Sequence, residues 1–283
     1  FHMKVLVDPP IIEVLAEMQL NHSGVMGMAN WVREVRPDCV PTDGLNSPLD
    51  LVPHNGLDGE RPITDNELLA ELAGRKCYDS FGEKGAKRTN REYLDSMWQG
   101  RVPHRSTGYH AKMTFFIANV SRRVSHELIR NYVGSDRTEE GSPSQESTRF
   151  THHPGIYIAH PRIVDQPAKL ERFTRHAEHN YAWYQKTIKD EMEEYQTRFG
   201  TPPKGLARKR IYESAANDLL HSCSTSFIWT TNPMAMIKFF HERDDEGADL
   251  EIIRFARTWK AIAFARWPNL FSHAFPELQQ AQR

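Results

Sequence analysis

The strongest constraint on the fold is one long amphipathic stretch in the second half of the chain. It opens at Asp165-Gln166-Pro167, and apolar residues then recur at three- and four-residue steps as far as Phe199, just before Gly200. This spacing predicts one continuous helix, because it places the apolar residues on one face and glycine commonly follows a helix end. We expect this face to form core or a subunit interface rather than a cofactor site.

Shorter helices surround a few candidate strands. Helical patterns cover about 64–73, where Thr64 is the expected N-cap, and about 121–131, 206–221, 234–243 and 248–265. Strands are expected at 4–7 and 113–120, where the residues are apolar. Pro, Gly, Asp and Asn residues crowd 30–65, which predicts a long loop or insertion, and 133–143 should also be a loop. Together these elements predict an α+β fold.

Composition limits the classes of protein to consider. The chain has 283 residues, 39% of them hydrophobic, and a net charge of -1. We expect a single domain over 3–283, with Phe1-His2 resembling vector residues, and no general attraction to nucleic acid or membranes. No apolar run approaches the roughly 20 residues of a membrane span. Three cysteines without CxxC spacing (Cys39, Cys77 and Cys223) argue against disulfides and zinc and favour the cytoplasm.

Several common catalytic motifs are missing. His126-Glu127 lacks the second histidine of HExxH, so we expect no metal. The chain has neither GxGxxG after a strand nor GxxxxGK[ST], which disfavours Rossmann and P-loop nucleotide sites, and it has no GxSxG nucleophile elbow.

A polar segment after the 121–131 helix is the best candidate site. Arg130, Arg137 and Arg149 lie within twenty positions and alternate with serines, and 144–150 reads Ser-Gln-Glu-Ser-Thr-Arg-Phe. Hydroxyl and guanidinium groups donate hydrogen bonds to phosphate and carbonyl oxygens, so this segment suits a phosphate or a base edge. The alternative from spacing alone is a polar loop with surface salt bridges.

The same region resembles the flavin-dependent thymidylate synthases, the ThyX family. That family has a helix of the type Ser-Arg-x-x-Ser-His-Gln-Leu-Val-Arg and then Arg-His-Arg, seven residues and Ser-x-Arg-aromatic. Here 121–130 reads Ser-Arg-Arg-Val-Ser-His-Glu-Leu-Ile-Arg, and 147–150 reads Ser-Thr-Arg-Phe. Further similar segments, in the family's order, are 74–78, 104–110, 157–158, 229–232, 239–243 and 248–252.

The chain also departs from the family pattern. Asn131-Tyr132 stands where the family has His-Arg, and 133–146 provides fourteen positions instead of seven. A second register places Arg137-Thr138-Glu139 on Arg-His-Arg and restores the gap. Glu127 replaces a glutamine, and Ala216 falls near the family's phosphate-binding arginine. These changes surround the expected nucleotide.

The resemblance implies a ThyX-like fold, with a central, mainly antiparallel sheet and long helices, assembled as a homotetramer that binds FAD where subunits meet. It implies C5-methylation of a uridine monophosphate, UMP and/or dUMP, with methylenetetrahydrofolate as carbon donor and NADPH as reductant. Catalytic roles would fall to Arg243 and Arg130. The remaining implied substrate contacts are Glu127, Gln145, Ser147, Thr148 and Arg149. The implied FAD contacts are His104, Ser106, Arg130, Asn131, Arg137, Gln145, Asn232 and Lys238.

Three functions remain open. The changes around the nucleotide favour a specialised UMP/dUMP 5-methylase, similar to family members of nucleoside-antibiotic pathways. An ordinary dUMP-specific thymidylate synthase is the first alternative. The second is a non-catalytic relative that binds flavin or nucleotide.

Overall fold

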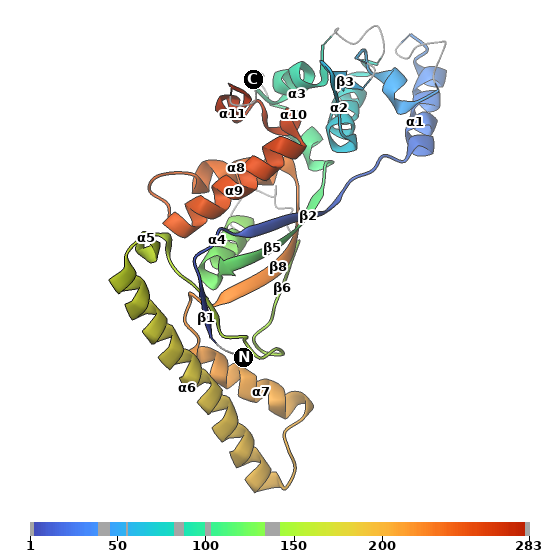
Figure 1. Cartoon of the computed structure of the whole chain (residues 1–283). Coiled ribbons are helices and arrows are strands. Elements are labelled where there is room, and N and C mark those ends of the chain that lie inside the picture. The colour runs from blue at the N-terminus through green and yellow to red at the C-terminus, as the bar shows by residue number, and fades with distance from the viewer. Residues whose placement is uncertain are drawn as a thin grey trace.

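A four-stranded antiparallel sheet forms the centre of the chain. The computed structural model describes residues 3–38, 46–54, 56–81, 88–99, 103–133 and 142–280, so Cys39 and Arg137 lie outside the described residues. The strand order is β2-β5-β8-β6 (Figure 1). These strands are β2 (Ile11–Glu17), β5 (Met113–Ser121), β6 (Ser142–Gln145) and β8 (Ser224–Thr231). The expected strand at 113–120 is thus confirmed as β5.

One face of the sheet carries the core. Met113, Phe115 and Ile117 alternate along β5 and are fully buried, and across the β8 pairing Trp229 lies opposite Phe115. The helices that cover this face are α4 (Arg122–Val133), α8 (Pro233–Arg243) and α9 (Leu250–Arg266). The Phe115 and Trp259 rings meet edge to face at 5.3 Å, a favourable aromatic geometry. All three helices were expected from the sequence.

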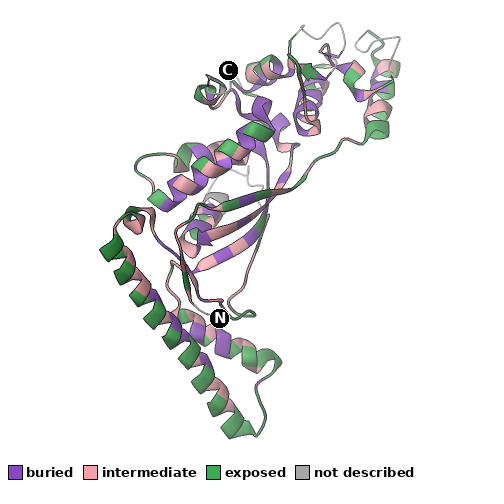
Figure 2. Cartoon of the chain, in the orientation of Figure 1, coloured by how far each residue is buried: buried purple, intermediate pink, exposed green. Residues whose placement is uncertain are grey.

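The long amphipathic stretch forms α6 (Pro167–Phe199), as predicted. It makes a hairpin with α7 (Gly205–Ala215) that extends away from the sheet (Figure 1). Tyr181, Tyr184 and Ile188 are buried along the shared face, whereas most of the outer face is exposed (Figure 2). Gly200 ends α6 in the left-handed conformation, with φ of 72°, which glycine adopts without a Cβ clash.

The remaining elements are short or lie in the N- and C-terminal parts of the chain. Strands β1 (Lys4–Leu6) and β7 (Ile156–Ile158) pair in parallel, and β3 (Leu57–Asp58) pairs with β4 (Arg61–Pro62). The other helices are α1 (His22–Val35), η1 (Pro48–Leu51), α2 (Asp65–Tyr78), α3 (Asn90–Gln99), η3 (Arg105–Tyr109), α5 (Pro161–Val164), η4 (Ala216–Asp218), α10 (Pro268–Phe271) and α11 (Pro276–Gln280).

The expected loop at 30–65 needs correction. Helix α1 occupies its first six positions, and Asn21 caps that helix by accepting a hydrogen bond from the Gly24 amide. Within 46–62 the structure contains η1 and the β3–β4 hairpin. Likewise, β6 occupies the end of the loop expected at 133–143. Its Pro143 is tolerated because β6 is an edge strand, where one side of the strand needs no ladder donor.

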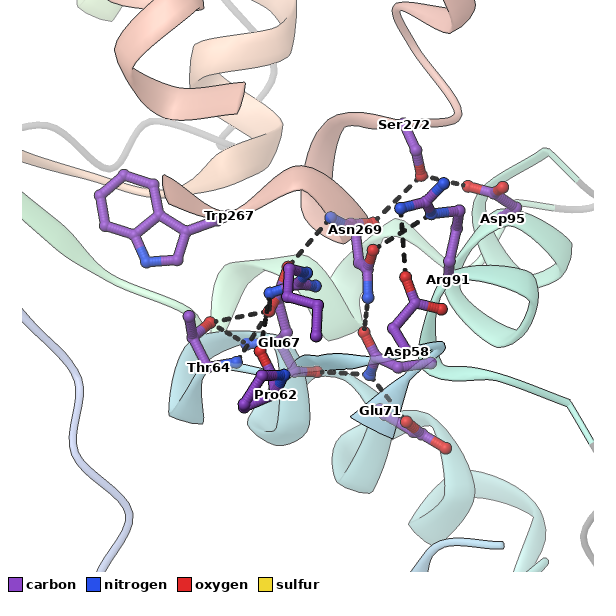
Figure 3. Close-up of polar contacts among 12 residues, drawn as sticks. Asp58, Pro62, Thr64, Glu67, Glu71, Arg91, Asp95, Trp267, Asn269 and Ser272 are labelled. Carbon is purple, nitrogen blue, oxygen red and sulfur yellow. Dashed lines mark hydrogen bonds and ion pairs between the residues drawn. The ribbon is translucent and has the colours of Figure 1, made fainter. Parts of the chain in front are cut away.

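Two buried glutamates on α2 hold the N-terminal elements together, and one of them, Glu67, also bonds the C-terminal part of the chain (Figure 3). Glu67 accepts hydrogen bonds from Arg61, from Thr64 in a capping box, and from the Asn269 amide of α10. Glu71 accepts from Arg75 at 2.7 Å and from Asn90 at 2.7 Å, and its other contact is His54 at 2.8 Å.

These contacts keep the Glu71 carboxylate ionised. Burial raises its pKa, but the His54 hydrogen bond and the Arg75 charge outweigh burial and hold the pKa below its ordinary value. Glu71 and Arg75 are both fully buried, so neither charge has water to replace a lost partner.

We predict that Glu71→Ala lowers the free energy of unfolding by about 3–5 kcal/mol, because it leaves the Arg75 charge buried and unpaired. Glu171→Ala is the matched control, since Glu171 and Arg175 form the same i,i+4 pair on the exposed face of α6 and should contribute little. Denaturant unfolding measures both. Should Glu71→Ala not fold, Glu71→Gln retains the side-chain shape. Equal small losses at the two sites would contradict the prediction.

Candidate functional site

Helices α4 and α8 meet through two of the predicted site residues. Arg243, at the end of α8, pairs with Glu127 of α4, with 3.2 Å between Nη2 and Oε2. The Arg243 side chain is 20% exposed, and its buried Nε has no hydrogen-bond partner among the described residues. The Arg243 guanidinium is therefore fixed by one carboxylate and still has a donor available.

Gln145 connects β6 to both neighbouring elements. Its amide nitrogen donates to Ser125 of α4 and to Thr225 of β8, both at 2.9 Å. These two bonds use both amide hydrogens, so only the carbonyl oxygen of Gln145 remains available to another group.

The segment after β6 carries Ser147, Thr148 and Arg149. The Ser147 carbonyl accepts from the Phe150 and Thr151 amides at 3.1 and 3.0 Å, which folds the segment into a tight turn. Arg149 is exposed and forms an ion pair with Glu213 of α7. The turn thus presents a guanidinium at the surface between β6 and α7.

A buried histidine fixes the end of this segment. The His153 backbone amide donates to Tyr184 Oη at 3.0 Å. Its Nδ1 accepts from the Gly155 amide at 3.2 Å, and Nε2 lies 3.3 Å from the Ser224 carbonyl oxygen, to which it donates in the neutral ring. Burial lowers the pKa of His153 to about 4, so the ring is neutral at pH 7.

A cavity of about 650 Å³ lies between η3, α8 and the start of the C-terminal segment. Its lining includes Trp98, Arg105, Tyr109, Lys238 and His273. Burial, followed by the nearby Arg105 charge, lowers the pKa of His273 to about 4. Arg105 and Lys238 also line this cavity, and Lys238 Nζ lies 3.8 Å from the Glu242 carboxylate of the same lining. The Arg105 guanidinium suits an anionic ligand.

Other predicted cofactor residues lie in or next to the same elements. His104 precedes η3 and its Nε2 is 2.6 Å from Tyr78 Oη, while Ser106 is an exposed residue of η3. Asn232 is fully buried and caps α8 through its Oδ1, whereas its Nδ2 has no hydrogen-bond partner in the described chain.

The structure places the predicted residues in three groups. Glu127 and Arg243 are in contact, Gln145 to Arg149 follow β6, and His104, Ser106, Asn232 and Lys238 belong to η3 and α8. Arg130 is exposed in the last turn of α4. Asn131 belongs to the same helix, without a described side chain, and Arg137 lies outside the described residues.

Sequence reasoning missed the residues that complete these groups. Glu213 was read only as part of a helix, and Arg105 and His273 were given no role at all. Adjacency to His104 was the only available signal for Arg105. Glu213 and His273 had none, because their contacts join segments that lie far apart in the chain.

Comparisons with known proteins show the family of this chain. A family model described as "Thymidylate synthase complementing protein" matches residues 62–269. The flavin-dependent thymidylate synthase of Corynebacterium aurimucosum is 30% identical over 220 residues, covering 76% of this chain and 84% of the relative. The enzyme of the same name from Mycolicibacterium vanbaalenii is 33% identical over 191 residues, covering 66% and 71%.

A solved structure shares the fold. The UMP/dUMP methylase PolB from Streptomyces cacaoi, in a crystal structure bound with 5-Br UMP, matches with a TM-score of 0.57. The match covers 98% of this chain and 97% of PolB at 16% identity, a level that supports the shared fold alone. It confirms the predicted α+β fold with an antiparallel sheet.

These findings identify the chain as a thymidylate synthase-like methyltransferase. It belongs to the thymidylate synthase complementing protein family, which confirms the resemblance seen in the sequence.

The described residues contain no group of three or more His, Cys, Asp or Glu side chains arranged to hold a metal ion. None of the helices described is long and apolar enough to cross a membrane.

We predict that stability falls as the pH decreases from about 6.5 to 4. In this range the unfolded chain protonates histidines of ordinary pKa 6.5, whereas folded His153 and His273, with pKa values of about 4, resist protonation. Thermal unfolding at pH 7, 6 and 5 measures the slope. His273→Asn should flatten it and His22→Gln, at an exposed site, should not. An unchanged slope in His273→Asn would exclude His273 as a source.

Proposed function

We propose that the chain methylates C5 of a uridine monophosphate, UMP and/or dUMP, with FAD as cofactor, methylenetetrahydrofolate as carbon donor and NADPH as reductant. The observation that carries this proposal is the Glu127–Arg243 pair on α4 and α8, since Gln145 also contacts α4 through Ser125. Arg243 offers a guanidinium to the pyrimidine carbonyls, and Arg149, on the turn after β6, offers a second one to the phosphate. The names of the family relatives and of PolB support the same chemistry.

The cavity beside η3 and α8 fits a flavin dinucleotide. Arg105 offers a cation for a pyrophosphate, and Lys238 offers a second one if the ligand replaces Glu242, which lies 3.8 Å from it. The buried Nδ2 of Asn232 offers a hydrogen-bond donor without a partner among the described residues, as a buried polar group requires. Of the predicted FAD contacts, Lys238 lines this cavity. We propose that it holds FAD together with His104, Ser106 and Asn232, which lie in or next to η3 and at the start of α8, and that Arg130, Asn131 and Arg137 complete the site where subunits of a homotetramer meet.

When bound, the reduced flavin supplies the hydride of the reaction. The protein orients the reactants and stabilises charge. Arg243 faces the uracil carbonyls and stabilises the negative charge that develops on them as C5 becomes nucleophilic. Glu127 fixes the Arg243 guanidinium from the side of α4, and Arg130 adds a second positive charge at the end of that helix.

Substrate binding falls to the segment after β6. Arg149 and Ser147 bind the phosphate by charge-assisted hydrogen bonds, and Thr148 lies between them. The carbonyl oxygen of Gln145 accepts a hydrogen bond from the ribose or the base, because its amide hydrogens are already used by Ser125 and Thr225.

We propose the specialised UMP/dUMP methylase as the particular function, of the kind used in nucleoside-antibiotic pathways. The supporting observation is Glu127, which is charged where the family has glutamine and is held by Arg243. The second supporting observation is the segment before Ser147, which is longer than in the family. A ribose hydroxyl needs both space and a partner, and a pocket that lacks them rejects it by about 1–3 kcal/mol.

The purified protein tests this proposal directly. It should show a flavin absorption spectrum and convert both UMP and dUMP into their 5-methyl products when methylenetetrahydrofolate and NADPH are present. A kcat/KM for dUMP at least about a hundredfold above that for UMP would contradict the specialised function and support an ordinary thymidylate synthase. A protein that binds flavin and nucleotide but yields no product would support the non-catalytic alternative.

We predict that replacing all three cysteines with serine leaves methylation measurable. Cys77 is exposed and Cys223 is buried. Burial raises the pKa of Cys223 to about 11, so its thiolate is scarce at pH 7. Loss of flavin from the variant is acceptable if added FAD restores turnover. Complete loss of turnover with FAD still bound would indicate a covalent cysteine intermediate.

A further inference from the structure

The turn that carries Arg149 is firmly held at both ends. At its start, the Glu146 amide donates to the Ser226 carbonyl at 3.0 Å, and the Glu146 carbonyl accepts from Arg122 at 3.0 Å. At its end, buried His153 is bonded to Tyr184 and to Ser224. The backbone positions of the turn are therefore set by the sheet and α6.

The middle of the turn, in contrast, meets α7 through the side chains of Arg149 and Phe150. Arg149 pairs with Glu213, and Lys209 Nζ lies 4.9 Å from the centre of the Phe150 ring. Lys209 and Glu213 are four residues apart, which places them on the same face of α7. The same face of α7 thus presents the carboxylate that pairs with Arg149 and a second cation, Lys209.

We propose, on the basis of the proposed nucleotide substrate, that Glu213 is a positioning residue that competes with the substrate phosphate for Arg149. Without nucleotide, Glu213 holds the guanidinium against α7. A bound phosphate takes Arg149 from Glu213, and Lys209 provides a second positive charge on the same helix face. The affinity for the phosphate is therefore set by α7 as well as by the turn.

The exposure of the pair makes this exchange possible. The side chains of Arg149 and Glu213 are 54% and 34% exposed, and solvent-exposed ion pairs are held only weakly. A nucleotide phosphate carries a charge of about -1.5 to -2 near pH 7 and accepts a guanidinium bidentately, so it binds Arg149 more strongly than one carboxylate does. Glu213 thus lowers nucleotide affinity by a small, measurable factor.

Glu213→Gln tests the competition by equilibrium binding, with no need for turnover. Calorimetric titration of UMP, dUMP and uridine into the full-length protein should show the two monophosphates binding about three- to fivefold more tightly to the variant. Uridine, which has no phosphate, should bind as it does to the unchanged protein. Glu191→Gln is the matched control. Glu191 of α6 accepts a hydrogen bond from Ser214 of α7, so the change removes the same charge beside α7.

Two further variants assign the effect to the named groups. Arg149→Ala should weaken UMP binding. Adding Glu213→Gln to that variant should not increase its affinity for UMP, because the guanidinium for which Glu213 competes is absent. Lys209→Ala should weaken UMP binding several-fold and leave uridine binding unchanged. Its control is Lys189→Ala, which removes an exposed lysine that pairs with Glu193 on α6.

The outcomes separate this inference from the proposed function. Unchanged or weaker UMP binding by Glu213→Gln, or an equal gain for uridine, overturns the competition. If such a variant still methylates UMP or dUMP, the proposed function stands without it. If the unchanged protein binds neither monophosphate, the proposed function and the competition are both wrong.

Discussion

The antiparallel pairing of β5 with β8 is the constraint on which the site depends. It creates a continuous apolar face, with Phe115 opposite Trp229. Exposure of this face to water is unfavourable, so helices bury it. Helices α4, α8 and α9 cover it, and the chain enters α4 and α8 directly from these two strands. Burial of the sheet therefore brings Glu127 and Arg243 into contact, although they lie more than a hundred positions apart in the chain.

Charge is handled differently inside and outside this core. The Glu67 and Glu71 carboxylates of α2 are buried and bonded: Glu67 holds α2 to α10, and Glu71 holds α2 to α3 through Asn90. Arg149 and Glu213 are exposed, so their pair can be exchanged for a ligand. Fixed charges thus define the scaffold, whereas the exchangeable pair lies where the substrate phosphate is proposed to bind.

The sequence predicted elements whose signals are local. The stripe of α6 and the Thr64 N-cap were both correct, because each depends on residues within a few positions. Strand β2 was missed, since Glu13, Leu15 and Ala16 do not favour a strand and the segment is held by its pairing with β5. The same limit applied to the site. The family resemblance indicated Arg149, Arg243 and Glu127, but Glu213 and the pairing of Arg243 with Glu127 became evident only in the folded chain.

Release of isotope from C5 of the substrate tests the central claim most directly. With 5-deuterated UMP or dUMP, reduced flavin and methylenetetrahydrofolate, the protein should release deuterium to water, because methylation replaces the hydrogen at C5. Release should depend on the folate, and it should fall steeply in Arg243→Ala if that guanidinium stabilises the developing charge. No release from either nucleotide, or release unaffected by Arg243→Ala, would contradict the account.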